Sequence, residues 1–118
     1  MRIAEEDVRV LLCTIGAGDG PGFVRGLVED RLIACGNIVA SVRSVYRWQG
    51  AVHDDPEDLI VMETRSDDID ATIAAIQERH PYDVPKILAI APDAVLPAYA
   101  SWVMAQTAPS RPSGSNAE

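Results

Sequence analysis

Apolar residues change their spacing several times along the chain, and each spacing predicts a different element. Residues 7–15 are rich in Val, Leu and Ile on both alternating faces, which is typical of a buried central strand. A run with four glycines follows, and from Phe23 apolar residues recur at four-residue spacing. This spacing predicts a helix, and we expect it to end near Cys35 and Gly36.

The middle of the chain predicts a long β-hairpin. From Asn37 to Trp48 the spacing changes to two, and the alternate residues that begin at Ile38 are expected to share one face. The turn is expected at Gln49-Gly50, because glycine adopts the positive φ that tight hairpin turns require. The second strand of the hairpin should run from Ala51, break at residues 54–56 and resume over residues 59–64.

The last third of the chain predicts two helices with a strand between them. Ile69, Ile73 and Ile76 form a stripe on one helix face, which Asp67 is placed to cap and Pro81 to end. Residues 84–91 form the next expected strand and residues 99–106 a short C-terminal helix. The predicted order is βαββαβ plus a helix, the ferredoxin-like pattern of an α+β protein with a long central hairpin.

The length of the hairpin predicts an oligomer. A strand over residues 38–48 spans about 36 Å, whereas a chain of 118 residues forms a domain with a diameter of roughly 34 Å. The hairpin should therefore project beyond its own core and carry Val45, Tyr46 and Trp48 into water. Burial against other copies of the chain would cover this apolar edge, so we predict a homo-oligomer.

Composition and charge narrow the classes of function. Ten basic and eighteen acidic residues leave a formal net charge of −8, which argues against a nucleic-acid partner because phosphate backbones are bound by clustered basic residues. The apolar runs are far shorter than the ~20 residues of a membrane helix, so no membrane partner is expected. Glu5, Glu6 and Asp7 stand where a signal peptide would be basic and then apolar, which favours a cytoplasmic protein.

One domain is expected over residues 1–106. The chain has 118 residues, 47% of them hydrophobic, which suits a single core. Residues 107–118 lose the apolar periodicity and are rich in Pro, Ser and Gly, so they predict a disordered tail. Cys13 and Cys35 show no CxxC spacing, which favours reduced thiols over a disulfide framework or a structural zinc site.

Four segments of the chain resemble the CutA family of divalent-cation tolerance proteins. They are LVEDRLIACGNI at 27–38, SVYRWQGAV at 44–52, HPYDVPKI at 80–87 and PAYASW at 97–102. The resemblance covers residues 8–106 in order. It implies a ferredoxin-like domain that assembles into a homotrimer, similar in architecture to the PII signalling proteins. It also implies a link with copper tolerance and the binding of copper(II) or another divalent cation.

The resemblance implies metal ligands at Cys13 and His80. In family members with Cys-Thr at the end of the first strand and His-Pro-Tyr after the second helix, these positions are linked to copper binding, and both patterns stand here. A soft thiolate and an imidazole suit copper as ligands. The alternative interpretation is a buried strand cysteine beside a histidine that hydrogen-bonds a neighbour, since cysteine is among the most buried residue types.

Several positions depart from the family pattern. Glu63 stands where the family usually has Lys, and Lys86 where it usually has Glu, so the two are expected to form a pair of reversed polarity within or between subunits. Arg79 replaces a second histidine, and Asp83 replaces a glutamate. The glycine-rich run replaces an Ala-Pro-Asp-like turn after the first strand.

Three further features admit a functional and a structural interpretation, and we prefer the structural one for each. The glycine-rich run could form a backbone nest for an anion, but it matches neither GxGxxG nor a P-loop. The acidic run at residues 54–58 lies beside His53 without EF-hand spacing, so a solvated loop that protects a strand edge is preferred over a cation site. The aromatic residues expected to anchor the core and interfaces are Tyr46, Trp48, Tyr82, Tyr99 and Trp102.

Together these features predict a cytoplasmic homotrimer that binds divalent metal, with copper(II) as the leading cation, and contributes to cation tolerance. No triad-like constellation accompanies Cys13 and His80, so no enzymatic activity is expected. One alternative is a PII-like trimeric signalling module that binds a small ligand at subunit clefts. Another is a trimeric scaffold that anchors a partner protein.

Overall fold

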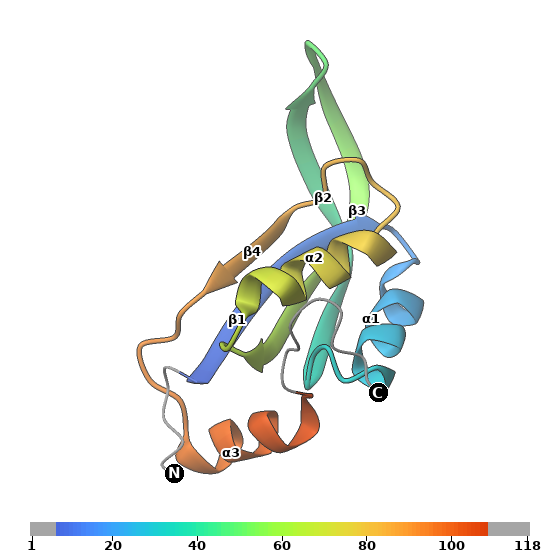
Figure 1. The fold of residues 1–118 in the computed structure, drawn as a ribbon. Coiled ribbons are helices and arrows are strands. Elements are labelled where there is room, and N and C mark those ends of the chain that lie inside the picture. Colours follow the sequence, from blue (N-terminus) through green and yellow to red (C-terminus); the bar gives the residue numbers. More distant parts are fainter. Residues whose placement is uncertain (1–6, 109–118) are drawn as a thin grey trace.

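The computed structural model describes residues 7–108, which form one antiparallel sheet with three helices (Figure 1). The elements are β1 (Val8–Gly16), α1 (Gly20–Glu29), β2 (Cys35–Trp48), β3 (Ala51–Arg65), α2 (Ile69–Arg79), β4 (Ile87–Ile90) and α3 (Pro97–Gln106). The four strands lie in the order β2-β3-β1-β4, with β1 between β3 and β4. The α+β ferredoxin-like fold is confirmed.

Helices α1 and α2 cover one face of the sheet, and the main hydrophobic core lies beneath them (Figure 1). Alternate residues of β1, namely Leu11, Cys13 and Ile15, point into this core and are at most 2% exposed. The stripe predicted on α2 is confirmed, since Ile76 is fully buried and Ile69 and Ile73 pack beside it (both in the same core). None of the helices within residues 7–108 is long and apolar enough to cross a membrane.

The opposite face of the sheet is open over most of its area. Val10 and Leu12 of β1 pair there with Ile90 and Leu88 of β4, and the two β4 side chains are 45% and 48% exposed. Helix α3 covers only the end of the sheet that is remote from the hairpin, where Val103 joins a smaller core. The open face therefore presents an apolar surface that the described chain does not cover.

The β2–β3 hairpin projects beyond the domain, as its length predicts (Figure 1). Pairing between β1 and β3 ends at Glu57, and beyond it β2 and β3 continue as a two-stranded ribbon over residues 43–56, here called the arm. The turn at Gln49 and Gly50 has positive φ at both positions, 51° and 80°. The arm stretches the molecule to 49 × 34 × 24 Å.

The break expected at residues 54–56 is wrong, because β3 is continuous from Ala51 to Arg65. Pro56 pairs with Arg43 of β2 and lies just past the end of the β1 ladder at Glu57. The strand therefore has only one neighbour at this point, and proline, which lacks an N–H group, is tolerated where one edge of a strand is unpaired.

The expectation that the alternate residues from Ile38 to Trp48 share one face is also wrong. The register between β2 and β3 shifts between Val39 and Val42, and Ser41 at this bulge has a φ of 59°. Ile38 consequently packs against the core beneath the helices, whereas Val42 lines the open side. A single extra residue in one strand reverses the alternation beyond it.

Helix α1 ends at Glu29, several residues before the glycine that was expected to end it. Arg31 adopts a left-handed φ of 61°, its N–H bonds the carbonyl of Val28, and the N–H of Leu32 bonds the carbonyl of Leu27. This is a Schellman-type end with arginine where glycine is usual. Other bounds also differ: β4 is shorter than expected, β2 and α3 each begin two residues earlier than expected, and the residue before α2 is Asp68 rather than Asp67.

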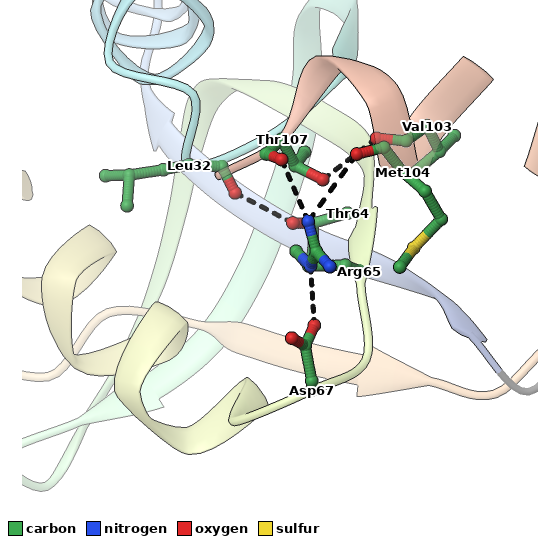
Figure 2. A network of polar contacts seen from close by, with 7 residues as sticks. All are labelled: Leu32, Thr64, Arg65, Asp67, Val103, Met104 and Thr107. Carbon is green, nitrogen blue, oxygen red and sulfur yellow. Dashed lines mark hydrogen bonds and ion pairs between the residues drawn. The ribbon is translucent and has the colours of Figure 1, made fainter. Parts of the chain in front are cut away.

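The C-terminal helix is tied to the sheet by Arg65 (Figure 2). Its guanidinium bonds the carbonyl of Thr107 at 2.9 Å and Oδ1 of Asp67 at 2.6 Å, while the hydroxyl of Thr107 bonds the carbonyl of Val103. Thr107 and Ala108, expected at the start of the tail, are thus held to the domain, the latter through a backbone bond to Arg31. The rest of the expected tail lies outside the described residues.

Candidate functional site

Cys13 lies near the middle of β1 and is fully buried beneath the helices. Burial, assisted by the negative charge of Glu57, raises the pKa of its thiol to about 11. The thiol is therefore protonated at neutral pH, and it donates a hydrogen bond to the carbonyl of Thr14 at 3.6 Å. A protonated thiol is a poor metal ligand, because metals bind the thiolate.

His80 lies directly after α2 and is 7% exposed. Its Nε2 is 2.8 Å from the carbonyl oxygen of Thr14, and its Nδ1 accepts a hydrogen bond from the backbone N–H of Tyr82 at 3.1 Å. Since a carbonyl only accepts, we infer that Nε2 carries the proton of a neutral ring. The rings of Phe23 and Tyr82 pack against the imidazole in T-shaped arrangements. Both ring nitrogens are therefore hydrogen-bonded, and the ring itself is held between two aromatic side chains.

The structure brings the two candidate metal ligands together, because Cys13 and His80 both bond the carbonyl of Thr14. Both are arranged as donors to that oxygen, which is the arrangement expected of the structural alternative. Among residues 7–108 no group of three Cys, His, Asp or Glu side chains could hold a metal ion. Coordination at this pair within one chain would require the thiol to lose its proton, and the histidine either to release its Nε2 proton or to free Nδ1 from the Tyr82 hydrogen bond.

A cleft of about 800 Å³ opens on the other side of β1, where the arm leaves the domain. Its floor includes Thr14 and Leu59, its upper wall is formed by the arm, and its far wall by the segment between α2 and β4. Tyr46 and Trp48 of the arm line it and are each 41% exposed. This is the size of many small-molecule sites.

The charged side chains that line the cleft are Arg43, Glu57, Asp83 and Lys86, and Tyr82, between α2 and β4, lines it as well. Glu57 is 7% exposed, and its Oε2 accepts the hydroxyl of Tyr82 at 2.7 Å. Burial and this carboxylate raise the pKa of Tyr82 well above its usual range, so the phenol stays protonated and continues to donate. Lys86 lines the cleft at its exposed rim.

The glycine-rich turn does form a backbone nest, but a carboxylate of the chain occupies it. The N–H groups of Gly18 and Gly20 both donate to Oδ2 of Asp58 at 3.0 Å, and the N–H of Ser41 donates to Oδ1 at 3.1 Å. These bonds lower the pKa of Asp58. A side chain at Gly20 would place its Cβ 2.8 Å from the Asp58 carboxylate, so glycine is required here for the backbone to approach that carboxylate. The Asp58 carboxylate thus occupies the nest in place of an external anion.

The acidic run is part of β3 and not the solvated loop that was expected. Each of its carboxylates has its own partner: Asp54 pairs with Arg43 through two bonds of 2.8 and 2.9 Å, and Asp55 accepts the hydroxyl of Tyr46 at 2.7 Å. Glu57 and Asp58 point to opposite faces of the sheet. The run is therefore distributed over the strand and does not gather around a cation.

Glu63 and Lys86 form no ion pair with each other within the described chain. Glu63 instead accepts the hydroxyl of Tyr99 at 2.8 Å, beside the half-buried Cys35. Lys86 precedes Ile87, whose partner on β1 is Cys13, whereas Glu63 pairs with Val10. Their pairing across a subunit boundary stays a prediction.

Sequence reasoning missed the cleft and its carboxylate. Glu57 was grouped with the acidic run, although its position one residue before Asp58 places it on the opposite face of a strand. A second signal was the single lysine of the chain, which follows the His-Pro-Tyr segment. Only the position of the bulge in β2 brings the arm over these two residues, and the sequence does not mark that bulge with a glycine.

Comparison with known proteins gives a consistent result. The family model described as CutA1 divalent ion tolerance protein matches residues 10–106. The divalent-cation tolerance protein CutA of Pyrococcus horikoshii is 38% identical over 71% of this chain and 81% of its own length. A CutA homolog of Xenopus laevis is 35% identical over 69% of this chain, and this chain spans about half the length (54%) of that protein.

Solved structures that share this fold carry the same family name. CutA1 from Oryza sativa superposes with a TM-score of 0.82 at 30% identity, over 88% of this chain and 96% of its own. The divalent ion tolerance protein CutA1 from Ehrlichia chaffeensis gives a TM-score of 0.80 at 33% identity, over 86% and 96% of the two chains.

Proposed function

This chain belongs to the CutA1 family of divalent ion tolerance proteins. From that premise we propose that it acts as a homotrimer that binds divalent cations without catalysing a reaction. Copper(II) is the leading candidate among these cations. The observation that carries the cation proposal is that Cys13 and His80 lie together at the carbonyl of Thr14, where both can serve as ligands once the thiol has lost its proton. Thiolate and imidazole are ligands that copper prefers. The net charge of −8 also favours the approach of cations.

The homotrimer is supported by the apolar surface that one chain leaves open. Val45 and Val52, on the face of the arm opposite to Tyr46 and Trp48, are 64% and 63% exposed. The open sheet face adds Leu88 and Ile90 of β4 to this surface. Exposed apolar surface on both an arm and a sheet face is typical of subunits that assemble.

Calorimetric titration with Cu(II) tests the proposed ligands, with pH held near neutrality. The wild-type chain should bind copper, and the double variant Cys13→Ala with His80→Ala should lose at least tenfold in affinity. The chain offers matched controls, because it contains one other cysteine and one other histidine: Cys35→Ala and His53→Ala should bind copper as the wild type does. Circular dichroism checks that each variant is folded.

Two results would contradict the proposed site. Unchanged copper affinity in the folded double variant would assign Cys13 and His80 to the structural alternative. Loss of affinity in the Cys35→Ala and His53→Ala controls would place the metal elsewhere. Because the thiol proton must leave when copper binds to sulfur, the affinity of the wild type should also rise with pH toward the thiol pKa of about 11.

A second candidate function is a PII-like signalling module that binds a small ligand. The specific observation in its favour is the cleft of about 800 Å³ beside the arm, with a buried carboxylate and two aromatic side chains in its walls. The scaffold function and the cytoplasmic location stay predictions from the sequence.

A further inference from the structure

Two opposite charges face the cleft without meeting each other. Glu57 uses Oε2 to accept the Tyr82 hydroxyl, and its Oε1 accepts no hydrogen bond from any residue in 7–108. Glu57 as a residue is 7% exposed, yet no buried side-chain oxygen within residues 7–108 lacks a hydrogen-bond partner, so Oε1 is reached by solvent from the cleft. A carboxylate oxygen in such a position is stabilised by a hydrogen-bond donor, and most strongly by a cationic donor.

Lys86 supplies the opposite charge at the same cleft. It is the only lysine of the chain, and within the described residues its ammonium group forms neither an ion pair nor a hydrogen bond. Glu57 and Lys86 both act electrostatically on the Cys13 thiol, which places them around the same end of β1. The other cation of the cleft, Arg43, is already paired with Asp54.

The wall of the cleft beside these charges is aromatic. Tyr46 and Trp48 each leave 41% of their surface exposed there. An aromatic face attracts a ligand cation as well as apolar groups. The cleft therefore combines an acceptor for an ammonium group, a cation for an acid group, and an apolar surface between arm and domain.

We propose that this cleft binds a small zwitterion of the amino-acid class, with its ammonium group on Oε1 of Glu57, its carboxylate on Lys86 and its side chain against Tyr46 and Trp48. An amine alone would engage only Glu57, and an acid alone only Lys86. The proposal rests on the second candidate function, the signalling module, and involves neither proposed copper ligand.

The test begins with the twenty standard L-amino acids and the full chain as it exists in solution. Reductive methylation with formaldehyde and cyanoborohydride modifies amines, and peptide mass spectrometry reads the single lysine without ambiguity. A bound amino acid should slow the methylation of Lys86 at least threefold. Free lysine methyl ester, added as a tracer amine at a fixed concentration, provides the reference for any general effect on the reagent.

Calorimetry then compares the strongest binder with its decarboxylated amine and its deaminated acid. The amino acid should bind at least tenfold more tightly than either analogue, since only it engages both charges. Glu57→Gln and Lys86→Met should each remove that advantage, whereas Glu78→Gln, on the exposed side of α2, should keep it. Lys86 is exposed, so its variant is expected to fold even if Glu57→Gln does not.

Each contrary outcome has a distinct meaning. Equal binding of an analogue that lacks one charge would overturn the zwitterion proposal and leave a ligand-binding cleft in place. Absence of binding and of Lys86 protection across the whole panel would overturn this proposal, whereas the signalling module, which is not restricted to amino acids, would not be overturned by it. Copper titration of the same preparation reports separately on the cation function, because it depends on Cys13 and His80.

Discussion

At the scale of single residues, Asp58 explains the most about local structure. Its carboxylate receives three backbone N–H groups, from two positions of the glycine-rich turn and from the bulge residue Ser41. It is 2% exposed. One side chain therefore orders the connection to α1 and also the bulge from which the arm departs. The positive φ of Ser41, unusual for a residue with a side chain, is maintained by this contact.

We expect Asp58→Asn to destabilise the domain, with a melting temperature several degrees below that of the wild type at pH 6. The amide replaces one accepting oxygen by a donor, so at least one backbone N–H group loses its partner. Thermal unfolding followed by circular dichroism measures the difference. Asp93→Asn, in an exposed loop, is the control and should unfold as the wild type does.

The same variant should reveal a dependence on pH. Hydrogen bonds from Ser41, Gly20 and Gly18 lower the pKa of Asp58 in the folded state. The stabilisation by its carboxylate is therefore complete above the unfolded pKa of about 3.9 and is lost as pH falls through the lower folded value. The stability difference between wild type and Asp58→Asn should shrink below about pH 4. A difference that stays constant down to pH 2 would show that the carboxylate charge does not matter.

At the scale of elements, the sequence predicts the order of strands and helices but not where they bend. Apolar periodicity identifies β1, α2 and the hairpin, since burial of one face is a local property of the pattern. It misses the bulge at Ser41 because the polar partner that holds it, Asp58, is 17 residues away. It misses the end of α1 because Arg31 takes a conformation usually marked by glycine. Likewise, Cys13 and His80 could be named as neighbours through family resemblance, whereas their shared acceptor could not.

The attachment of α3 is an element-scale feature with a clear test. Arg65 is 13% exposed and donates to the carbonyls of Thr107 and Met104 and to Asp67. Arg65→Met should cost about 2 kcal/mol of unfolding free energy, since charge-assisted hydrogen bonds to buried partners are lost. Amide hydrogen exchange should then accelerate in α3 first, because Arg65 bonds carbonyl groups at the C-terminal end of this helix (Figure 2).

A matched arginine makes the comparison specific. Arg25 forms an exposed ion pair with Glu29 within α1, with 81% of its side chain exposed. Arg25→Met should therefore cost no more than about 0.5 kcal/mol. If both variants lose the same stability, or if exchange accelerates uniformly, then Arg65 does not act as the tie of α3.

At the scale of the whole molecule, the described chain leaves a large apolar surface uncovered. Its core lies on one side of the sheet, while the open face and the arm carry apolar residues that the described chain leaves in water. The cleft shares the arm as a wall, so assembly and ligand binding would be coupled through the same element. Asp58 accepts a hydrogen bond from Ser41, the bulge residue from which the arm departs, so this one carboxylate also helps to position the arm.

Arm valines provide the sharpest test of the proposed trimer. Val45→Thr with Val52→Thr keeps β-branched side chains and so preserves the strands. In a monomer both positions are more than 60% exposed, and such substitutions change stability by no more than about 0.5 kcal/mol. In a trimer that buries the arm, they should cost about 1 kcal/mol at each position. Light scattering should show the wild type, whose chain has a mass of 12.7 kDa, as a trimer. The arm variant should dissociate at concentrations at which the wild type stays assembled. The control variant Val28→Thr, on α1, should have the same mass as the wild type. Equal masses and equal melting temperatures for wild type and arm variant would mean that the arm does not assemble the protein.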